Sequence, residues 1–494
     1  MTVRQQETSG PADTSPDELD RRIGAAAGAA RVLVDSRPAD RAAWLEAMAD
    51  RLDAAADDLV PLAAQETHLG VERLKGELKR TTFQLRLFTD VLRDGSFLQA
   101  TLDHADPDWP MGPRPDLRRM LRPIGPVAVY AASNFPFAFS VAGGDTASAL
   151  AAGCPVLLKA HPSHPQLSVA TGAVVADALR QGGAPDGTFA VVTGMDTGIA
   201  LVQDPRIRAA AFTGSLRAGR ALFDLAVSRP EPIPFYGELG SVNPAFVTPG
   251  TAAQRGEEVA TGFVGSVSLG NGQFCTKPGL LFVPAGSGLE DRVAALVGEK
   301  PATPMLSEQI RSGYSAALAG LAERPGVRVI AGEVEPEGDP SPTILAATAS
   351  DLLSDPEALT QECFGPAAIV VSYSSEEELL AVAQVFDGQL TATIHGEGQE
   401  PVTSALQKLL SERVGRVVWN GWPTGVSVSY AQHHGGPYPA TTSVQTTSVG
   451  TAAIDRFLRP VTFQDAPDDV LPPALQEVNP WRLPRRVNGV LQPA

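Results

Sequence analysis

The spacing of apolar side chains changes along this chain, and each change predicts a different structure. Residues 1–17 are rich in Thr, Ser, Gly, Pro and acidic side chains and have no apolar period, so we expect a mobile tail there. Between Asp17 and Leu98 apolar side chains recur every three to four residues, as in Trp44, Met48 and Leu52, which is the period of an amphipathic helix. A layer of helices should follow the tail.

From residue 127 onward, short apolar runs alternate with amphipathic segments. The predicted strands cover residues 127–130, 155–159, 189–193 and 209–213, and the predicted helices cover residues 140–152, 166–181, 199–203 and 215–229. Strands that alternate with helices indicate right-handed βαβ units and a mostly parallel sheet. A second alternating region runs from about residue 240 to residue 411. The predicted fold class is therefore α/β, with a Rossmann-like domain and a second α/β domain.

Beyond residue 460 the chain carries repeated prolines and should not form long helices. We expect an extended arm in this region. A chain of 494 residues is also too long for one simple core, so two or three domains are predicted.

Charge and composition narrow the class of protein. The net charge of −17 argues against nucleic acid or an anionic membrane as a partner, because both are negatively charged. No secretion signal and no run of about eighteen apolar residues is found, which predicts a cytoplasmic protein without a membrane span. The three cysteines, Cys154, Cys275 and Cys363, lack metal-ligand spacing, so neither a disulfide framework nor a metal site is expected.

Two segments carry candidate chemistry. Cys275 follows Gly270-Asn271-Gly272-Gln273-Phe274, a setting that predicts a thiol displayed on a tight turn. Glu238 stands between glycines at the end of an apolar run. Together they offer a nucleophile and a base. The alternative is an inert buried cysteine, since free cysteine is among the most buried residue types.

Six segments in order decide between these alternatives, because together they resemble the NAD(P)-dependent aldehyde dehydrogenases over roughly residues 20–465. They are Ser133–Pro136, Leu158–Pro162, Phe212–Ser215 with Gly219, Glu238–Gly240, Gly272–Cys275 and Glu362–Pro366. Three further segments resemble the NADP-preferring 2,5-dioxovalerate (α-ketoglutarate semialdehyde) dehydrogenases: Phe139–Thr146, Pro230–Pro234 and His434–Pro439.

The resemblance implies a covalent mechanism. The Cys275 thiolate attacks the aldehyde, and the Cys275 N–H with the Asn134 side chain stabilises the oxyanion. Hydride transfer leaves a thioester, and Glu238 is the general base that activates water to hydrolyse it. His433 and His434 precede a Gly-Gly-Pro turn, and their role is left open between function and a solvated surface position. Cys154 is expected to be structural and Cys363 to serve packing.

The resemblance also implies which residues bind the cofactor. Gly214, Ser215 and Gly219 would hold the pyrophosphate at a helix N-terminus, and Lys159 the adenosine ribose. Glu362 and Phe364 would hold the nicotinamide ribose and ring. Many NAD-preferring relatives have a glutamate three residues after the lysine, whereas this chain has Pro162. With Ser163 and His164 as further donors, NADP is the expected cofactor and NAD a possible one.

Domains, assembly and substrate follow from the same resemblance. The implied division is a tail (1–17), a cofactor-binding domain (18–116 and 127–239), a catalytic domain (240–411) and an oligomerisation hairpin with a C-terminal arm (117–126 and 430–494). The arm implies a homodimer or homotetramer. The implied reaction converts 2,5-dioxopentanoate to 2-oxoglutarate, and Lys277 is the candidate partner of the substrate anion.

Two other functions stay open at this point. The first is a dehydrogenase for long-chain aliphatic or aromatic aldehydes, in which Phe135, Phe137 and Phe274 would form an apolar channel. The second is a non-catalytic structural or binding protein on the same fold.

Overall fold

A layer of four helices begins the part of the chain that the computed structural model describes, residues 10–398 and 400–493. The helices are α1 (Pro16–Leu33), α2 (Pro38–Ala54), α3 (Ala56–Thr67) and α4 (Val71–Asp94). The apolar stripe predicted from Trp44, Met48 and Leu52 is buried against the first α/β unit. The helical layer predicted for this region is therefore confirmed.

The prediction of a mobile tail over residues 1–17 is wrong for the second half of that segment. Residues 1–9 lie outside the described residues. Thr14 N donates to Thr193 O at 3.1 Å, Thr193 Oγ1 donates to Ala12 O at 2.8 Å, and helix α1 already starts at Pro16. The segment thus lies along the edge of the first sheet, because its backbone finds hydrogen-bond partners that a composition argument does not see.

The first α/β unit contains a five-stranded parallel sheet in the order β5-β4-β3-β6-β7. Its strands are β3 (Val127–Tyr130), β4 (Val156–Lys159), β5 (Phe189–Val192), β6 (Ala209–Thr213) and β7 (Phe235–Glu238). The connecting helices are α5 (Gly144–Ala152), α6 (Pro165–Gln181), α7 (Met195–Gln203) and α8 (Leu216–Val227). All four predicted strands and all four predicted helices of this region are present, with shifted ends.

The second unit is built around a seven-stranded sheet in the order β10-β11-β12-β9-β8-β13-β14, parallel except for β10. Its strands are β8 (Ala245–Val247), β9 (Leu280–Pro284), β10 (Arg328–Ala331), β11 (Thr343–Thr348), β12 (Ala367–Tyr373), β13 (Gln389–His395) and β14 (Val414–Trp419). Its helices are α9 (Pro249–Ser268), α10 (Leu289–Val297), α11 (Glu308–Ala322), α12 (Ala349–Ser354), α13 (Pro356–Leu359), α14 (Glu376–Gln384) and α15 (Pro401–Ser411). The α/β class is thereby confirmed for both units.

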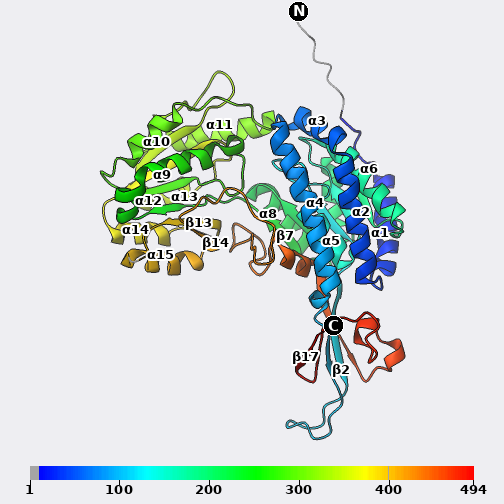
Figure 1. Cartoon of the computed structure of the whole chain (residues 1–494). Coiled ribbons are helices and arrows are strands. Elements are labelled where there is room, and N and C mark those ends of the chain that lie inside the picture. Colours follow the sequence, from blue (N-terminus) through cyan, green and yellow to red (C-terminus); the bar gives the residue numbers. More distant parts are fainter. Residues whose placement is uncertain (1–9, 399, 494) are drawn as a thin grey trace, which may run out of the picture.

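A third sheet projects from the first unit (Figure 1). Its order is β15-β2-β1-β16-β17. The strands are β1 (Thr101–Asp103), β2 (Leu117–Pro123), β15 (Leu458–Gln464), β16 (Arg485–Val487) and β17 (Val490–Gln492). As the prolines predicted, the described residues beyond 457 form strands and 3-10 turns and no α-helix.

Three predicted boundaries move. Residues 101–103 belong to the third sheet and not to the cofactor unit, because β1 pairs with β2 and β16. The second unit ends after residue 411, since β14 pairs with β13. Residues 430–457 are not part of the arm: Arg456 Nη2 pairs with Asp145 Oδ1 at 2.8 Å and holds the 3-10 turn η3 (Thr451–Phe457) against α5.

The carboxyl ends of β3, β4, β6 and β7 lie along one edge of the parallel sheet. Ligands of open α/β sheets bind at this edge, at the point where the strand order reverses. The chain reverses here, because β4 and β5 lie on one side of β3 and β6 and β7 on the other. The described residues contain no helix long and apolar enough to cross a membrane.

Candidate active site

Cys275 lies in a loop that three left-handed residues shape. Helix α9 ends at Ser268, and Gly270, Asn271 and Gly272 then have φ values of 57°, 55° and 65°. A Cβ atom on Gly272 would lie 2.2 Å from the Gly365 carbonyl oxygen, so only glycine allows the two loops to pack. The Cys275 side chain is partly exposed. The predicted thiol on a tight turn is thus present.

The cysteine loop is fixed from both sides. Asn271 Nδ2 donates to Thr303 O at 2.8 Å, and Gln273 Oε1 accepts from Leu306 N at 2.9 Å. Asn243 Nδ2 donates to the Cys275 carbonyl at 2.8 Å. These bonds tie the nucleophile to the second unit, so its position does not depend on the thiol itself.

Glu238 ends strand β7 and is buried, with 4% of its surface exposed. Its Oε2 accepts from Ser448 Oγ at 2.6 Å, and its Oε1 is 2.8 Å from His434 Nε2. The backbone of residues 440–442 bonds to the same strand end, where Leu239 N donates to Ala440 O at 2.8 Å. Residues 434–448, near the C-terminal end of the chain, therefore cover the Glu238 carboxylate.

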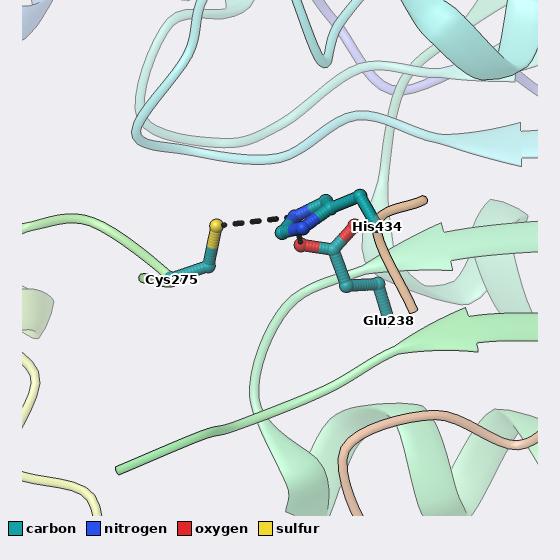
Figure 2. Close-up of side chains that lie close together, drawn as sticks. All are labelled: Glu238, Cys275 and His434. Atoms are coloured by element: carbon teal, nitrogen blue, oxygen red, sulfur yellow. Dashed lines mark hydrogen bonds and ion pairs between the residues drawn. The ribbon is translucent and has the colours of Figure 1, made fainter. Parts of the chain in front are cut away.

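His434 joins the two residues that the sequence singled out. Its Nε2 lies 3.5 Å from Cys275 Sγ and 2.8 Å from Glu238 Oε1, and 1% of the residue is exposed (Figure 2). The His434 backbone is held by Thr447, whose Oγ1 accepts from His434 N at 2.8 Å. His433 instead packs against Gly415 and Gly435. The sequence left both histidines open, and the only signal for His434 was the His434–Pro439 segment.

The electrostatics of this cluster favour a charged carboxylate and a neutral thiol. Burial raises the pKa of the Cys275 thiol well above its usual range, and the Glu238 charge raises it further. Burial also raises the pKa of Glu238, but His434, Ser448 and the Cys275 thiol outweigh it and bring that pKa below its ordinary value. In the absence of substrate the Cys275 thiol therefore keeps its proton, and the ionised Glu238 carboxylate lies close enough to accept it.

Asn134 lies in the loop after β3 and reaches the cysteine loop. Its Nδ2 donates to Gln273 O at 3.0 Å, and the side chain is buried. An amide nitrogen carries two hydrogens, so this bond leaves one N–H of Asn134 unused. The Asn134 carbonyl accepts from Arg73 Nη2 at 2.8 Å, which fixes the loop on helix α4.

A nucleophile, a base and an amide donor at the carboxyl edge of a parallel sheet are what cysteine-dependent acyl chemistry requires. The model of the aldehyde dehydrogenase family matches residues 3–461. The chain belongs to the aldehyde dehydrogenase family.

Two curated relatives are similar to this aldehyde dehydrogenase over nearly their whole lengths. One is alpha-ketoglutaric semialdehyde dehydrogenase 2 of Azospirillum brasilense, 47% identical, with 91% of this chain and 87% of the relative covered. The other is alpha-ketoglutaric semialdehyde dehydrogenase of Acinetobacter baylyi, 44% identical, with 96% of this chain and 91% of the relative covered.

Solved structures agree on the fold. An NAD-dependent aldehyde dehydrogenase of Sinorhizobium meliloti has a TM-score of 0.76 at 21% identity and covers 92% of this chain and 87% of its own. A mutant aldehyde dehydrogenase C of Pseudomonas syringae, in complex with NAD+ and octanal, has a TM-score of 0.78 at 21% identity. The match covers 92% of this chain and 90% of that structure's chain. The family match and the two relatives at 44–47% identity, not these structures, make the chain an oxidoreductase that oxidises an aldehyde to a carboxylic acid with NAD(P)+.

The predicted cofactor residues of this dehydrogenase lie at the same sheet edge. Lys159 ends β4, is buried, and has Met195 Sδ at 3.6 Å as its hydrogen-bond partner. Ser215 caps the N-terminus of α8, where residues 214–218 are exposed. A Cβ on Gly219 would lie 2.1 Å from Leu239 Cδ2, so this glycine lets α8 pack against the strand that ends in Glu238.

Ser163 lies two residues beyond His161, whose Nδ1 accepts from Ser163 N at 3.1 Å. The expected donor role of His164 is wrong. Its Nε2 bonds to Ala132 O at 2.9 Å and its Nδ1 lies 3.3 Å from Ser168 Oγ, and the residue is fully buried. A histidine with both nitrogens engaged inside the core has no donor for a phosphate.

The expected role of Lys277 is also wrong. Its Nζ donates to Cys363 O at 2.8 Å and to Ala367 O at 2.5 Å, and 4% of the residue is exposed. Lys277 thus holds the Glu362 loop and does not reach a channel mouth. Burial raises the pKa of Glu362, and the Lys277 charge opposes this shift. Phe364 in the same loop is partly exposed.

The other two cysteines are buried, as predicted. The thiol of Cys154 donates to Phe457 O at 3.4 Å, and Cys363 lies in the core of the second unit. Within the described residues one group of metal-ligand type was found, namely Glu238, Cys275 and His434, whose ligand atoms lie within 4.8 Å of one another. The sequence spacing of the cysteines gave no sign of this group, because two of its members are not cysteines.

We predict that His434→Gln lowers kcat/KM for the aldehyde about 10- to 100-fold and moves the acid limb of the kcat profile to higher pH. Glutamine can still donate to Glu238 but carries no charge. Because His434 lowers the pKa of Glu238, its loss lets burial raise that pKa, and the carboxylate then forms only at higher pH. Steady-state rates across pH measure the shift. His433→Gln is the matched control, and an unmoved acid limb in His434→Gln would contradict the assignment.

Proposed function

We propose that this aldehyde dehydrogenase converts α-ketoglutaric semialdehyde (2,5-dioxopentanoate) to 2-oxoglutarate and prefers NADP+ to NAD+. The observation that carries the substrate proposal is the 47% and 44% identity to two relatives named for this activity, over more than nine-tenths of the chain. The Cys275, His434 and Glu238 cluster supplies the chemistry that the proposal needs.

In this proposal the thiol proton leaves toward the Glu238 carboxylate, with His434 holding both groups, as the sulfur attacks the aldehyde carbon. The new C–S bond turns the carbonyl oxygen into an oxyanion, which the Cys275 N–H and the free N–H of Asn134 stabilise. Bound NAD(P)+ supplies the acceptor for the hydride that leaves this tetrahedral carbon. Cys275 then carries a thioester.

Hydrolysis of the thioester needs an activated water, and Glu238 is the base within the cluster. The proton taken from the thiol first passes from Glu238 to solvent. The ionised carboxylate, which only accepts hydrogen bonds, then takes the water proton while hydroxide adds to the thioester carbon. The acid leaves, and the Cys275 sulfur is protonated again. Ser448 and His434 keep the carboxylate ionised and oriented between turnovers.

The residues present fit a dinucleotide. Lys159 is a buried ammonium whose partner is a thioether, a weak acceptor, so a ribose hydroxyl would complete its bonding. The exposed N-terminus of α8 at Gly214 and Ser215 suits a pyrophosphate. Glu362 and Phe364 would hold the nicotinamide ribose and ring.

The proposed NADP+ preference rests on Pro162, which is exposed beside Lys159 and offers no carboxylate to repel a 2′-phosphate. We predict that Pro162→Glu lowers the efficiency ratio of NADP+ to NAD+ about 10- to 100-fold, corresponding to roughly 1–3 kcal/mol. Initial rates with both cofactors give the ratio, which is insensitive to a general loss from a displaced Lys159. An unchanged ratio in the folded variant would place phosphate selection elsewhere.

The substrate proposal is tested by NADPH formation with a panel of α-ketoglutaric, succinic and glutaric semialdehydes, pentanal, octanal and benzaldehyde. The five-carbon dicarbonyl should have the highest kcat/KM. An optimum at octanal or benzaldehyde would instead support the second candidate. That candidate draws on the aromatic contact between Phe135 and Phe274, whose ring centroids are 5.1 Å apart next to Cys275. Phe137, the third aromatic residue predicted for the apolar channel, does not join this contact, because it is buried in the core of the first unit.

We further propose that the third sheet joins subunits into a homodimer or homotetramer. Its edge strand β17 leaves Val490 and Leu491 exposed, at 66% and 64%. Sedimentation equilibrium measures the number of subunits in the oligomer. A cytoplasmic location stays a prediction from composition.

A further inference from the structure

Phe135, Phe139 and Phe274 form an aromatic wall next to Cys275, and two arginines pack against it. Phe135 contacts Phe139 and Phe274, with ring centroids 5.3 and 5.1 Å away. Arg73 lies over Phe135 and Phe274, and Arg80 lies over Phe139 with Cζ 5.4 Å from the ring centroid. Both come from α4, seven residues and so about two turns apart, which puts them on one face of the helix. The wall next to the thiol is therefore not purely apolar.

Arg80 is separated from the nucleophile by two side chains. The Phe139 ring is 6.3 Å from the His434 ring, and His434 Nε2 is 3.5 Å from Cys275 Sγ. Burial lowers the pKa of Arg80, and the charges of Glu77, then Cys275 and Glu238, oppose this shift. The guanidinium thus lies within electrostatic reach of the reacting sulfur.

Arg416 approaches the same place from the second unit. It lies on β14, and its Nη2 donates to Pro423 O at 2.6 Å and its Nη1 to Gly425 O at 3.4 Å. Arg80 bonds the next carbonyl of this loop, from Nε and Nη2 to Val426 O at 3.4 and 3.2 Å. Two guanidinium groups from different units therefore converge on residues 423–426.

Neither cation is neutralised by a direct ion pair. Within the described residues no carboxylate oxygen lies within 4.0 Å of Arg80 or Arg416. The nearby Glu77 uses Oε1 to accept from Phe137 N and Ala138 N, at 2.8 and 3.0 Å. The loop carbonyls orient the guanidinium groups but leave their charge intact.

Each arginine also keeps a donor unused. Arg80 Nη1 and Arg416 Nε are buried and have no hydrogen-bond partner among the described residues. Leaving a buried charged donor unpaired is costly, so such a donor points to a ligand that completes it. Arg73 Nη1 is also buried without a partner among the described residues, but Arg73 Nη2 donates to the Asn134 carbonyl and so holds the loop after β3.

We propose that Arg80 and Arg416 form the subsite for a substrate carboxylate, so that this enzyme selects aldehydes whose far end is an anion. The inference rests on the proposed function and replaces Lys277 by two residues that no sequence motif marked. Guanidinium groups match a carboxylate in geometry and bind it with charge-assisted bonds. A neutral aldehyde would leave both donors buried and unpaired, which gives the site a means of rejecting it.

The test compares two aldehydes of equal length, the anion 5-oxopentanoate and neutral pentanal, with α-ketoglutaric semialdehyde as a third substrate. The wild type should favour both anions over pentanal. Arg80→Gln and Arg416→Gln should each raise KM for the anions about 10- to 100-fold, the loss expected for a hydrogen bond to a charged group. Their kcat/KM for pentanal should not fall, because the neutral aldehyde gains nothing from the two charges, and Arg80→Lys should recover part of the anion affinity.

Arg86→Gln is the matched control on α4, since Arg86 is paired with Glu46 and Asp50 away from the wall. Equal losses on 5-oxopentanoate and pentanal, or unchanged KM for the anions, would overturn the subsite, as would a wild type that prefers pentanal. Oxidation of 5-oxopentanoate without oxidation of α-ketoglutaric semialdehyde would refute the proposed substrate and leave the subsite standing. Unchanged NADP+ binding confirms that each variant is folded.

Discussion

Replacement of Cys275 by alanine is expected to abolish aldehyde oxidation and to leave NADP+ binding nearly intact. In the proposed mechanism the sulfur forms the covalent bond that makes hydride transfer possible, and no other described residue offers a nucleophile at this position. Loss of an enzyme's nucleophile lowers kcat by several orders of magnitude, so a fall of at least about 10⁴-fold is predicted. The residues proposed to bind the cofactor, Lys159, Gly214 and Ser215, lie on the other unit. Steady-state NADPH formation and a cofactor titration measure the two effects.

Cys154→Ala and Cys363→Ala are the controls. Both thiols are buried in packed cores and neither belongs to the Cys275, His434 and Glu238 cluster, so these variants should keep most of their activity. Substantial turnover by Cys275→Ala would refute the covalent mechanism. A Cys154→Ala variant as inactive as Cys275→Ala would show that cysteine loss acts through stability.

Glu238→Gln is expected to separate the two half-reactions. The amide cannot take a proton from water, so hydrolysis of the thioester should slow about 10²- to 10⁴-fold. Glu238→Gln also removes the acceptor proposed for the thiol proton. It removes at the same time the charge that raises the pKa of the Cys275 thiol, and the lowered pKa lets the thiol lose its proton to solvent instead. Rapid mixing should therefore show a burst approaching one NADPH for each subunit, followed by slow turnover.

The burst is the decisive quantity. If burst and steady turnover disappear together, Glu238 is needed to accept the thiol proton or to hold His434, whose Nε2 it binds at 2.8 Å. Ser448→Ala offers a milder comparison, because it removes one hydrogen bond to Glu238 Oε2 and keeps the charge. It should retain the burst and lose little of the steady rate.

Several errors of the sequence interpretation share one physical cause. Lys277, His164 and Phe137 have the right residue types and lie near the right motifs, yet all three are buried and Lys277 and His164 are engaged elsewhere. Burial depends on contacts between segments far apart in sequence, which a local pattern does not contain. The moved boundaries have the same origin, since strand β1 joins the arm only through its pairing with β2 and β16.

The sequence by itself determined the α/β class, the alternating elements of the first unit and the family, and it predicted Cys275 and Glu238 as nucleophile and base. These features are local: periodicity fixes the faces of helices and strands, and glycines at Gly270 and Gly272 fix the turn that carries the thiol. Only the tertiary structure decided the rest of the site. His434 is 159 residues from Cys275 and 196 from Glu238, in a segment without helix or strand. Arg80 and Arg416 come from different units and meet at one loop. Their proximity, and therefore the pKa values and the charge of the site, exists only once the chain has folded.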